Sequence, residues 1–257
     1  MEKKLIFDRS VPFYAVRRPT YPDSLIREVL DFSGAKPGEL AIEVGAGTGI
    51  ATQPMLDAGL KVVAYEPGEN LASYCRERFD GHSLTVKQAV FEDCDEPDGS
   101  AALVYSATAF HWCDPERGYA QAMRVLRPGG TLALFWNRPF IGRRDDPTHM
   151  AIQKAYDKWY PSDKVASELD QQRYAKRREQ IIEHGFELRE FKLFFGTRVM
   201  NAKEYCELLL TYSDHLALPD DRRNGLLEGV FDAIEHNGGS VTVYDTFDLH
   251  LATKPKD

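Results

Sequence analysis

Three glycines stand at every second position in the stretch AIEVGAGTGI, which begins at Ala41 and opens with a short apolar run. They are Gly45, Gly47 and Gly49. Glycine has no Cβ atom, so it permits a tight turn and lets backbone N–H groups come close to a ligand. Such a run after a strand indicates either a ligand-binding turn or a turn that only packing requires.

A carboxylate follows at the end of the next predicted strand. Glu66 comes directly after the apolar run 61–65, about 20 residues beyond the first glycine. At this spacing, nucleotide-binding α/β proteins place a carboxylate that accepts hydrogen bonds from ribose hydroxyls. The same carboxylate would repel a 2′-phosphate. Alone, Glu66 is equally consistent with a solvated acid, but together with the glycine turn it favours a nucleoside ligand.

The arrangement of the glycines separates the candidate ligands. The motif reads E-x-G-x-G-x-G from Glu43, whereas dinucleotide-binding turns read G-x-G-x-x-G. A phosphate-binding P-loop would carry a lysine after its last glycine, and none follows Gly49. The sequence therefore predicts a nucleoside rather than a dinucleotide or a nucleoside triphosphate.

The composition limits the partners. The chain has 257 residues and a net charge of −8, with its lysines and arginines spread along the sequence. An acidic chain without a basic stripe is poorly suited to bind nucleic acid, so we expect a small-molecule partner. No apolar run approaches the roughly 20 residues of a membrane span. The apolar segment 5–7 is too short for a signal peptide.

We therefore expect a cytoplasmic protein with no membrane partner, present as a monomer or a homodimer. Its four cysteines are scattered and show no metal-ligand spacing, which predicts reduced thiols and no metal.

Alternating apolar runs and helical patterns predict an α/β fold with a Rossmann-like doubly wound sheet. The predicted strands cover residues 40–44, 61–65, 84–89, 101–106, 131–136, 186–197 and 241–253. The first five alternate with helices and should be parallel. The last two should form an antiparallel edge hairpin, which completes a seven-stranded sheet.

We expect a single domain over residues 1–257. An N-terminal helix at about 7–32 precedes the core, which covers about 33–139 and 185–257. Residues 140–184 are polar and helical in pattern, and we interpret them as a helical cap.

Several longer motifs go beyond the glycine turn. AIEVGAGTG, VVAYEPG and VLRPGGTLALFW are similar to the first, second and strand-five motifs of the class I S-adenosylmethionine (SAM)-dependent methyltransferases. Further segments resemble a small-molecule subgroup related to trans-aconitate methyltransferases. They are Y-x3-RP-x-YP at 14–22, FED at 91–93, AFHW at 109–112 and TYSDH at 211–215. The resemblance spans about residues 7–253.

The resemblance implies SAM as the cofactor and S-adenosylhomocysteine as the product. Glu43 and the glycine turn would hold the amino-acid part and the ribose, and Glu66 would hold the ribose hydroxyls. The full set of implied cofactor residues is Tyr14, Arg18, Tyr21, Glu43, Gly45, Ala46, Gly47, Gly49, Glu66, Pro67, Val90, Phe91, Glu92, Ser106 and Ala107. The acidic residue usual before the adenine segment is absent, since Gln88 and Ala89 stand there. Glu92 or Asp93 could take its place.

His111 is the candidate catalytic residue, because it follows the fourth strand at the ligand-facing edge of the sheet. An equal alternative is a structural capping role. The candidate acceptor-binding residues are His111, Trp112, Trp136, Tyr212 and His215. The aromatic residues could equally be core, and Arg138, Arg143 and Arg144 could attract an anionic acceptor or form a solvated loop. Ser213, Asp214 and His215 are not expected to form a triad, because neighbours on a helix point apart.

Methyl transfer from SAM needs little chemistry from the protein. The methyl group is already activated on a sulfonium, so alignment and exclusion of water are the main requirements. A base is needed only where the acceptor must lose a proton, and a carboxylate has none to lose. We expect O-methylation of a small carboxylate or hydroxyl. The alternatives are a non-catalytic SAM-binding protein and an NAD-dependent oxidoreductase, which the G-x-G-x-G spacing disfavours.

Overall fold

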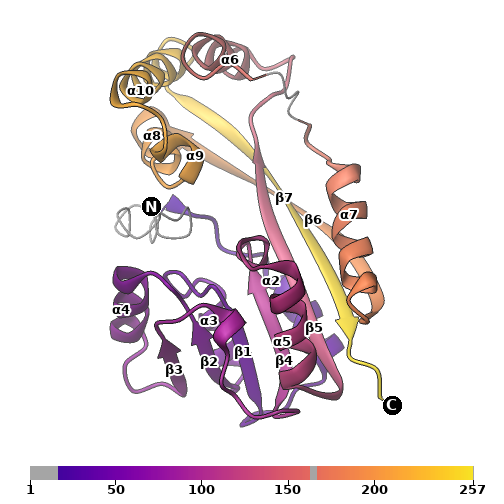
Figure 1. Cartoon of the computed structure of the whole chain (residues 1–257). Helices are drawn as coiled ribbons and strands as arrows, with labels where there is room; N and C mark the ends of the chain where they lie inside the picture. The colour runs from indigo at the N-terminus through magenta and orange to yellow at the C-terminus, as the bar shows by residue number, and fades with distance from the viewer. Residues whose placement is uncertain (1–16, 163–166, 257) are drawn as a thin grey trace. The chain divides into compact units, whose positions relative to one another are not determined.

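Seven strands form one sheet in the order β3-β2-β1-β4-β5-β7-β6 in the computed structural model, which describes residues 17–162 and 167–256 (Figure 1). The strands are β1 (Leu40–Val44), β2 (Lys61–Tyr65), β3 (Leu84–Lys87), β4 (Ala101–Ala107), β5 (Leu126–Phe140), β6 (Glu187–Asn201) and β7 (Ser240–Thr253). Strands β1 to β5 pair in parallel, and the order reverses between β1 and β4. The predicted doubly wound sheet is confirmed.

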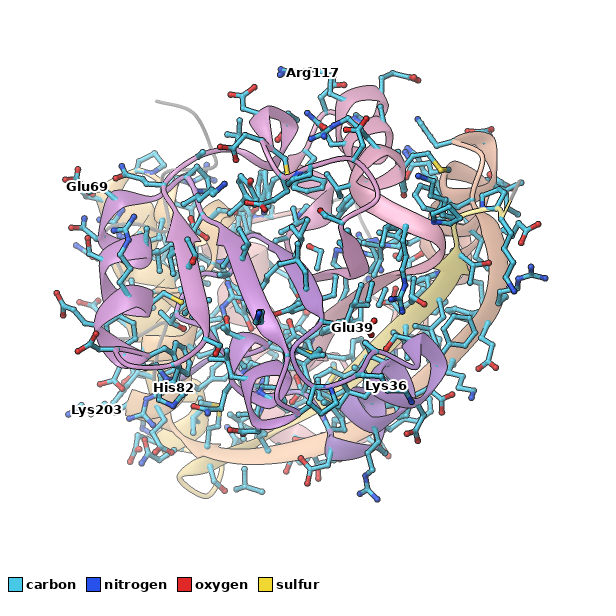
Figure 2. The ribbon with its side chains drawn as sticks, turned by 90° about the horizontal axis from the view of Figure 1, so that it is seen from below. Lys36, Glu39, Glu69, His82, Arg117 and Lys203 are labelled. Atoms are coloured by element: carbon cyan, nitrogen blue, oxygen red, sulfur yellow. The ribbon has the colours of Figure 1, made fainter. Side chains whose placement is uncertain are left out.

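Helices connect these strands. They are α2 (Asp23–Ser33), α3 (Thr52–Asp57), α4 (Glu69–Arg78), α5 (Pro115–Val125), α6 (Pro147–Trp159), α7 (Gln171–Glu183), α8 (Ala202–Leu209), α9 (Ser213–Leu216) and α10 (Asp220–Glu235), with short 3-10 turns η2 (Phe91–Asp93) and η3 (Phe110–Trp112). Charges complement the dipole of α4, with Glu69 in its first turn and Arg76 and Arg78 in its last (Figure 2 labels Glu69). None of the described helices is long and apolar enough to cross a membrane.

The later strands differ from the prediction in length and connection. We expected the fifth strand to start after the Pro128-Gly129-Gly130 segment, but β5 begins before it. The segment stays paired because Gly129 N–H donates to the Lys254 carbonyl at 3.0 Å and Lys254 N–H donates to Gly130 at 2.9 Å. Strands β6 and β7 are neighbours at the edge, yet helices α8 to α10 separate them in the chain, so no tight hairpin joins them.

The described chain divides into two compact units. The glycine-turn unit contains Thr20–Asn137, Gln171–Phe194 and the described residues from Phe247 onward. The α8–α10 unit contains residues 17–19 and Phe195–Thr246, together with the described part of Arg138–Asp170. The predicted cap at 140–184 holds α6 and α7, and these helices fall in different units. That cap boundary remains a proposal.

The core of the glycine-turn unit lies on both faces of its sheet. Successive residues of a strand point to opposite faces, and on β4 Leu103 and Val104 are both fully buried in different apolar clusters. Leu25 of α2 packs in the cluster with Leu103, and Leu132 of β5 packs with Val104. A parallel strand that is buried on both faces needs apolar residues at successive positions, which explains the sequence of β4.

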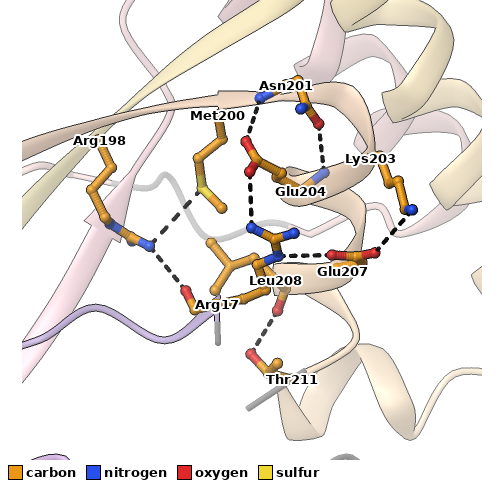
Figure 3. A network of polar contacts seen from close by, with 9 residues as sticks. All are labelled: Arg17, Arg198, Met200, Asn201, Lys203, Glu204, Glu207, Leu208 and Thr211. Carbon is orange, nitrogen blue, oxygen red and sulfur yellow. Dashed lines mark hydrogen bonds and ion pairs between the residues drawn. The ribbon is translucent and has the colours of Figure 1, made fainter. Parts of the chain in front are cut away.

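The α8–α10 unit has its own apolar core and a polar network at the start of α8 (Figure 3). Asn201 and Glu204 form a capping box, in which the Glu204 N–H donates to Asn201 Oδ1 at 2.9 Å. Arg17 donates to Glu204 at 2.9 Å and to Glu207 at 2.7 Å. Arg198 donates to the Arg17 carbonyl at 3.2 Å. These bonds fix Arg17 on α8.

Candidate functional site

The glycine turn lies where ligands bind in open α/β sheets. It follows β1 at the carboxyl edge, and β1 lies between β2 and β4, where the strand order reverses. Glu66 ends β2 and Ser106 lies near the end of β4, so the strand pairing brings these predicted residues to one edge of the glycine-turn unit.

Two of the glycines are required by the protein itself. Gly45 has φ +73°, and a Cβ there would lie 2.3 Å from the Cβ of Ala109. Gly49 has φ +80°, and a Cβ there would lie 2.3 Å from the Phe79 ring. The packing interpretation therefore accounts for Gly45 and Gly49. Gly45 also shows that the segment after β4 lies directly against the turn.

The Glu66 carboxylate is held by backbone N–H groups. Gly47 donates to Glu66 Oε2 at 2.8 Å and Gly68 donates to Oε1 at 2.9 Å. The side chain is 5% exposed. A carboxylate oxygen can accept more than one hydrogen bond. The carboxylate is thus oriented against the glycine turn and fits a ligand with neighbouring hydroxyls.

One oxygen of the buried Glu43 carboxylate lacks a hydrogen-bond donor among the described residues. Glu43 Oε2 accepts from the Thr52 hydroxyl at 2.5 Å and from the Tyr105 hydroxyl at 2.9 Å. Its Oε1 is buried and has no hydrogen-bond partner within the described part of the chain. Burial raises the pKa of Glu43 from 4.5 to about 7, and the Glu66 charge adds to the rise. A buried acceptor without a partner fits a cationic donor on a ligand.

The other predicted cofactor residues lie around this edge with varied contacts. Phe91 is buried and packs edge-on against Tyr65, with the ring centroids 5.9 Å apart. Ser106 donates to the Val44 carbonyl at 2.8 Å. Glu92 Oε1 accepts from the Asp114 N–H at 3.0 Å, so this oxygen already has a partner in the protein. Ala46 is buried, and the half-buried residues are Pro67, Val90 and Ala107.

The predicted cofactor residues near the N-terminus do not all belong to one unit. Tyr14 lies outside the described residues. Arg18 belongs to the α8–α10 unit, where it donates to the Thr211 carbonyl at 2.6 Å and lies 4.5 Å from the Tyr212 ring centroid. Tyr21 belongs to the glycine-turn unit.

Tyr21 supports a strained residue after β4. Its hydroxyl bonds to Thr108 Oγ1 at 2.8 Å, and Thr108 has φ 58°, the one positive φ among the described non-glycine residues. A β-branched residue is strained in this region. Thr108 Oγ1 also accepts from the Asn137 N–H at 3.1 Å. Thr108 was not predicted as a site residue, because nothing in its residue type indicates this conformation.

Tyr21→Phe is expected to lower the free energy of unfolding by about 1 kcal/mol, since it removes the hydroxyl that bonds to Thr108. Urea unfolding checks this change. The matched control is Tyr74→Phe, because Tyr74 is half-buried on α4. We expect the control to change stability by less than about 0.5 kcal/mol. Equal effects of the two substitutions would contradict the role given to the Tyr21 hydroxyl.

His111 lies on η3 and bonds to a tryptophan. The Trp136 indole N–H donates to His111 Nδ1 at 3.1 Å. Arg177 of α7 lies over the Trp136 ring, 3.7 Å from its centroid, and pairs with the buried Asp248. His250 Nε2 donates to Asp248 Oδ2 at 3.0 Å.

Two further features concern this cluster. Arg177, Asp248 and His250 were not predicted from the sequence. Asp248 and His250 alternate with apolar residues on the last strand, which was a usable signal for these two. Trp112 is half-buried, with its ring centroid 4.8 Å from that of His111.

His215 forms a separate polar chain in the α8–α10 unit. Its Nδ1 bonds to Asp214 Oδ1 at 2.9 Å and its Nε2 bonds to the Tyr156 hydroxyl at 2.8 Å. Our expectation that these neighbours point apart was wrong for Asp214 and His215, because Asp214 also accepts the His215 backbone N–H at 3.0 Å and so turns back toward it. Tyr160 and Tyr212 surround His215, with centroids 5.7 and 5.6 Å away.

The predicted anion-attracting arginines are largely paired. Arg138 donates to Asp170 at 2.6 Å, and Arg143 donates to Glu168 at 2.8 Å. Arg144 is exposed. Among the described residues, no group of three or more His, Cys, Asp or Glu side chains could hold a metal ion.

Parts of this chain are similar in sequence to known proteins. Residues 42–134 match the family model described as "Methyltransferase domain". An "Uncharacterized methyltransferase" of Mycobacterium tuberculosis is 34% identical over 158 residues, which cover 57% of this chain and 63% of that protein. A "Probable S-adenosylmethionine-dependent methyltransferase" of Saccharomyces cerevisiae is 34% identical over 125 residues, covering 46% of this chain and 42% of that protein.

The fold itself has solved counterparts. The structure of a "Putative Type II Methyltransferase" from Anaeromyxobacter dehalogenans has a TM-score of 0.69 at 20% identity, and the match covers 93% of this chain and 99% of that one. This likeness confirms the predicted fold class. Residues 42–134 are therefore similar to methyltransferase domains, and the chain has the Rossmann-like fold of class I methyltransferases.

Proposed function

We propose that this protein is a SAM-dependent methyltransferase that transfers a methyl group to an oxygen of a small molecule. The observation that carries the proposal is the Glu66 carboxylate, fixed by the N–H groups of Gly47 and Gly68 beside the glycine turn. A carboxylate so placed accepts hydrogen bonds from ribose hydroxyls. The name of the yeast relative, a SAM-dependent methyltransferase, supports the same cofactor.

Glu43 is the second group that we assign to the cofactor. Its buried Oε1 has no partner within the described residues, and the ammonium of the methionine part would supply one. When bound, SAM supplies an activated methyl group on a sulfonium. The turn and the Glu66 carboxylate would then orient the cofactor, and the buried residues of the turn would exclude water.

The remaining cofactor and acceptor residues predicted from the sequence are part of this proposal. The proposal also keeps the subgroup related to trans-aconitate methyltransferases, which rests on the RP-x-YP, FED, AFHW and TYSDH segments.

Turnover by the full chain tests the proposal. The purified protein is incubated with SAM and a panel of small carboxylic acids, phenols, alcohols and amines, and S-adenosylhomocysteine release is measured. We expect release that depends on one class of acceptor and falls in Glu66→Ala. Binding of SAM without release for any member would instead support a non-catalytic SAM-binding protein.

A further inference from the structure

One backbone carbonyl of the glycine turn accepts a hydrogen bond from a side chain outside the turn. Thr48 is fully buried, and its carbonyl oxygen accepts from Arg78 Nη1 at 3.0 Å. Within the described part of the chain, no other group donates to this oxygen. A buried carbonyl without a donor costs free energy, so Arg78 satisfies a group for which the turn has no donor of its own.

The helix α4 brings Arg78 to the turn from its last helical turn, where a positive charge complements the helix dipole. The Arg78 guanidinium lies over the ring of Phe79, 4.9 Å from its centroid. The same ring fills the space beside Gly49. The end of α4 therefore contacts the glycine turn through two adjacent residues, one by packing and one by a hydrogen bond.

The hydrogen bond from Arg78 fixes a peptide group of the turn from both sides. A trans peptide group is planar, and its C=O and N–H point in opposite directions. The Thr48 carbonyl shares its peptide group with the Gly49 N–H, which donates to the Ala46 carbonyl at 2.9 Å. The orientation of this peptide group is thus set by Arg78 at one side and by Ala46 at the other.

A second peptide group continues this chain of hydrogen bonds to Glu66. The Ala46 carbonyl shares its peptide group with the Gly47 N–H, which donates to Glu66 Oε2 at 2.8 Å. Arg78 and Glu66 therefore lie at the two ends of one chain of hydrogen bonds. A cation donates at one end and a carboxylate accepts at the other, and bonds in such a chain polarise and strengthen one another.

We infer that Arg78 is a positioning residue for the cofactor site, because it orients the peptide groups that direct the Gly47 N–H at Glu66. This inference rests on the proposed function, in which the glycine turn and Glu66 bind SAM. Without Arg78, the Thr48 carbonyl loses its donor and the peptide groups behind it are free to rotate. The Glu66 carboxylate is then less well oriented before the cofactor arrives, and binding has to supply that order.

Amide hydrogen exchange in the full protein without ligand tests the chain. We would follow the Gly47 and Gly49 amides by NMR in the unaltered protein, in Arg78→Ala and in Arg76→Ala. Arg76 is the matched control, because it is also exposed in the last turn of α4 but donates to the Val86 carbonyl of β3 at 3.2 Å. We expect both amides to exchange about 10-fold faster in Arg78→Ala and at an unchanged rate in the control. Unchanged rates in Arg78→Ala, or equal acceleration in both variants, would overturn the inference.

Titration with SAM tests the consequence for binding. The Kd for SAM should rise about 5- to 20-fold in Arg78→Ala, with circular dichroism to show that the variant is folded. Arg78→Lys keeps a charged donor and should raise the Kd about 3-fold or less, so rescue by lysine identifies the lost donor as the cause. Arg76→Ala should bind SAM as the unaltered protein does. Equal losses of affinity in the two alanine variants would contradict a specific role for Arg78.

The outcomes separate this inference from the proposed function. If the unaltered protein does not bind SAM, the proposed function fails, and the exchange rates of the two glycine amides still report on the chain. If the unaltered protein binds SAM but Arg78→Ala changes neither the exchange rates nor the Kd, the proposed function stands and the inference about Arg78 fails.

Discussion

Glu43→Gln is expected to stabilise the protein by about 3 kcal/mol at pH 8 and by much less at pH 5. The reason is the pKa of Glu43, which burial raises from 4.5 to about 7 in the folded protein. The folded state holds this proton more tightly than the unfolded state, so stability falls as the pH rises through this interval. Well above pH 7, the charged Glu43 carboxylate lowers the free energy of unfolding by about 3 kcal/mol, because each pKa unit corresponds to about 1.4 kcal/mol. Glutamine stays neutral, and its carbonyl can accept from Thr52 and Tyr105.

Urea unfolding of both proteins at pH 5 and pH 8 measures this effect. Glu69→Gln is the matched control, because Glu69 is an exposed carboxylate at the start of α4 (Figure 2). Glu69→Gln should change the free energy of unfolding by about the same amount at pH 5 and at pH 8. If Glu43→Gln shifts stability equally at pH 5 and pH 8, the charge of Glu43 is not the source of the effect. The same substitution should weaken SAM binding, which would explain why a destabilising carboxylate stands there.

Glu66→Ala is expected to weaken SAM binding about 10- to 100-fold, or about 1–3 kcal/mol for lost hydrogen bonds to a charged acceptor. The substitution also leaves the Gly47 and Gly68 N–H groups without their acceptor, so the turn itself should loosen. Glu66→Gln keeps one carbonyl acceptor. Its affinity for SAM should therefore lie between those of the unaltered protein and Glu66→Ala.

Calorimetric titration gives these affinities, with circular dichroism to show that each variant is folded. Glu69→Ala serves as the control for removal of a carboxylate near the same edge. An affinity for SAM that is unchanged in Glu66→Ala would show that Glu66 does not hold the ribose.

The sequence was sufficient for the sheet and for the edge at which the glycine turn lies. Alternating apolar runs and helices imply parallel strands, and a glycine turn after the first strand must then lie at the carboxyl edge. The length of β5 was not predictable in the same way. Gly129 and Gly130 look like a break, and only their pairing with Lys254, far along the chain, keeps the strand continuous.

The roles of individual site residues depended on tertiary contacts. The sequence favoured ligand contact as the reason for Gly49, but Phe79 occupies the space where its side chain would lie. His111 looked equally suited to be a cap or a catalytic group. Its Nδ1 accepts a hydrogen bond from Trp136, which lies on β5 and which no local pattern connects to it. Thr108 adopts a conformation that its residue type disfavours, and only its bonds to Tyr21 and Asn137 account for it.

Titration calorimetry tests most directly whether the glycine turn and Glu66 bind SAM. The full protein is titrated separately with SAM and with NAD, and the same titrations are repeated with Glu66→Ala. We predict saturable binding of SAM that weakens in the variant, with no comparable binding of NAD. Tight binding of NAD without binding of SAM would contradict this account.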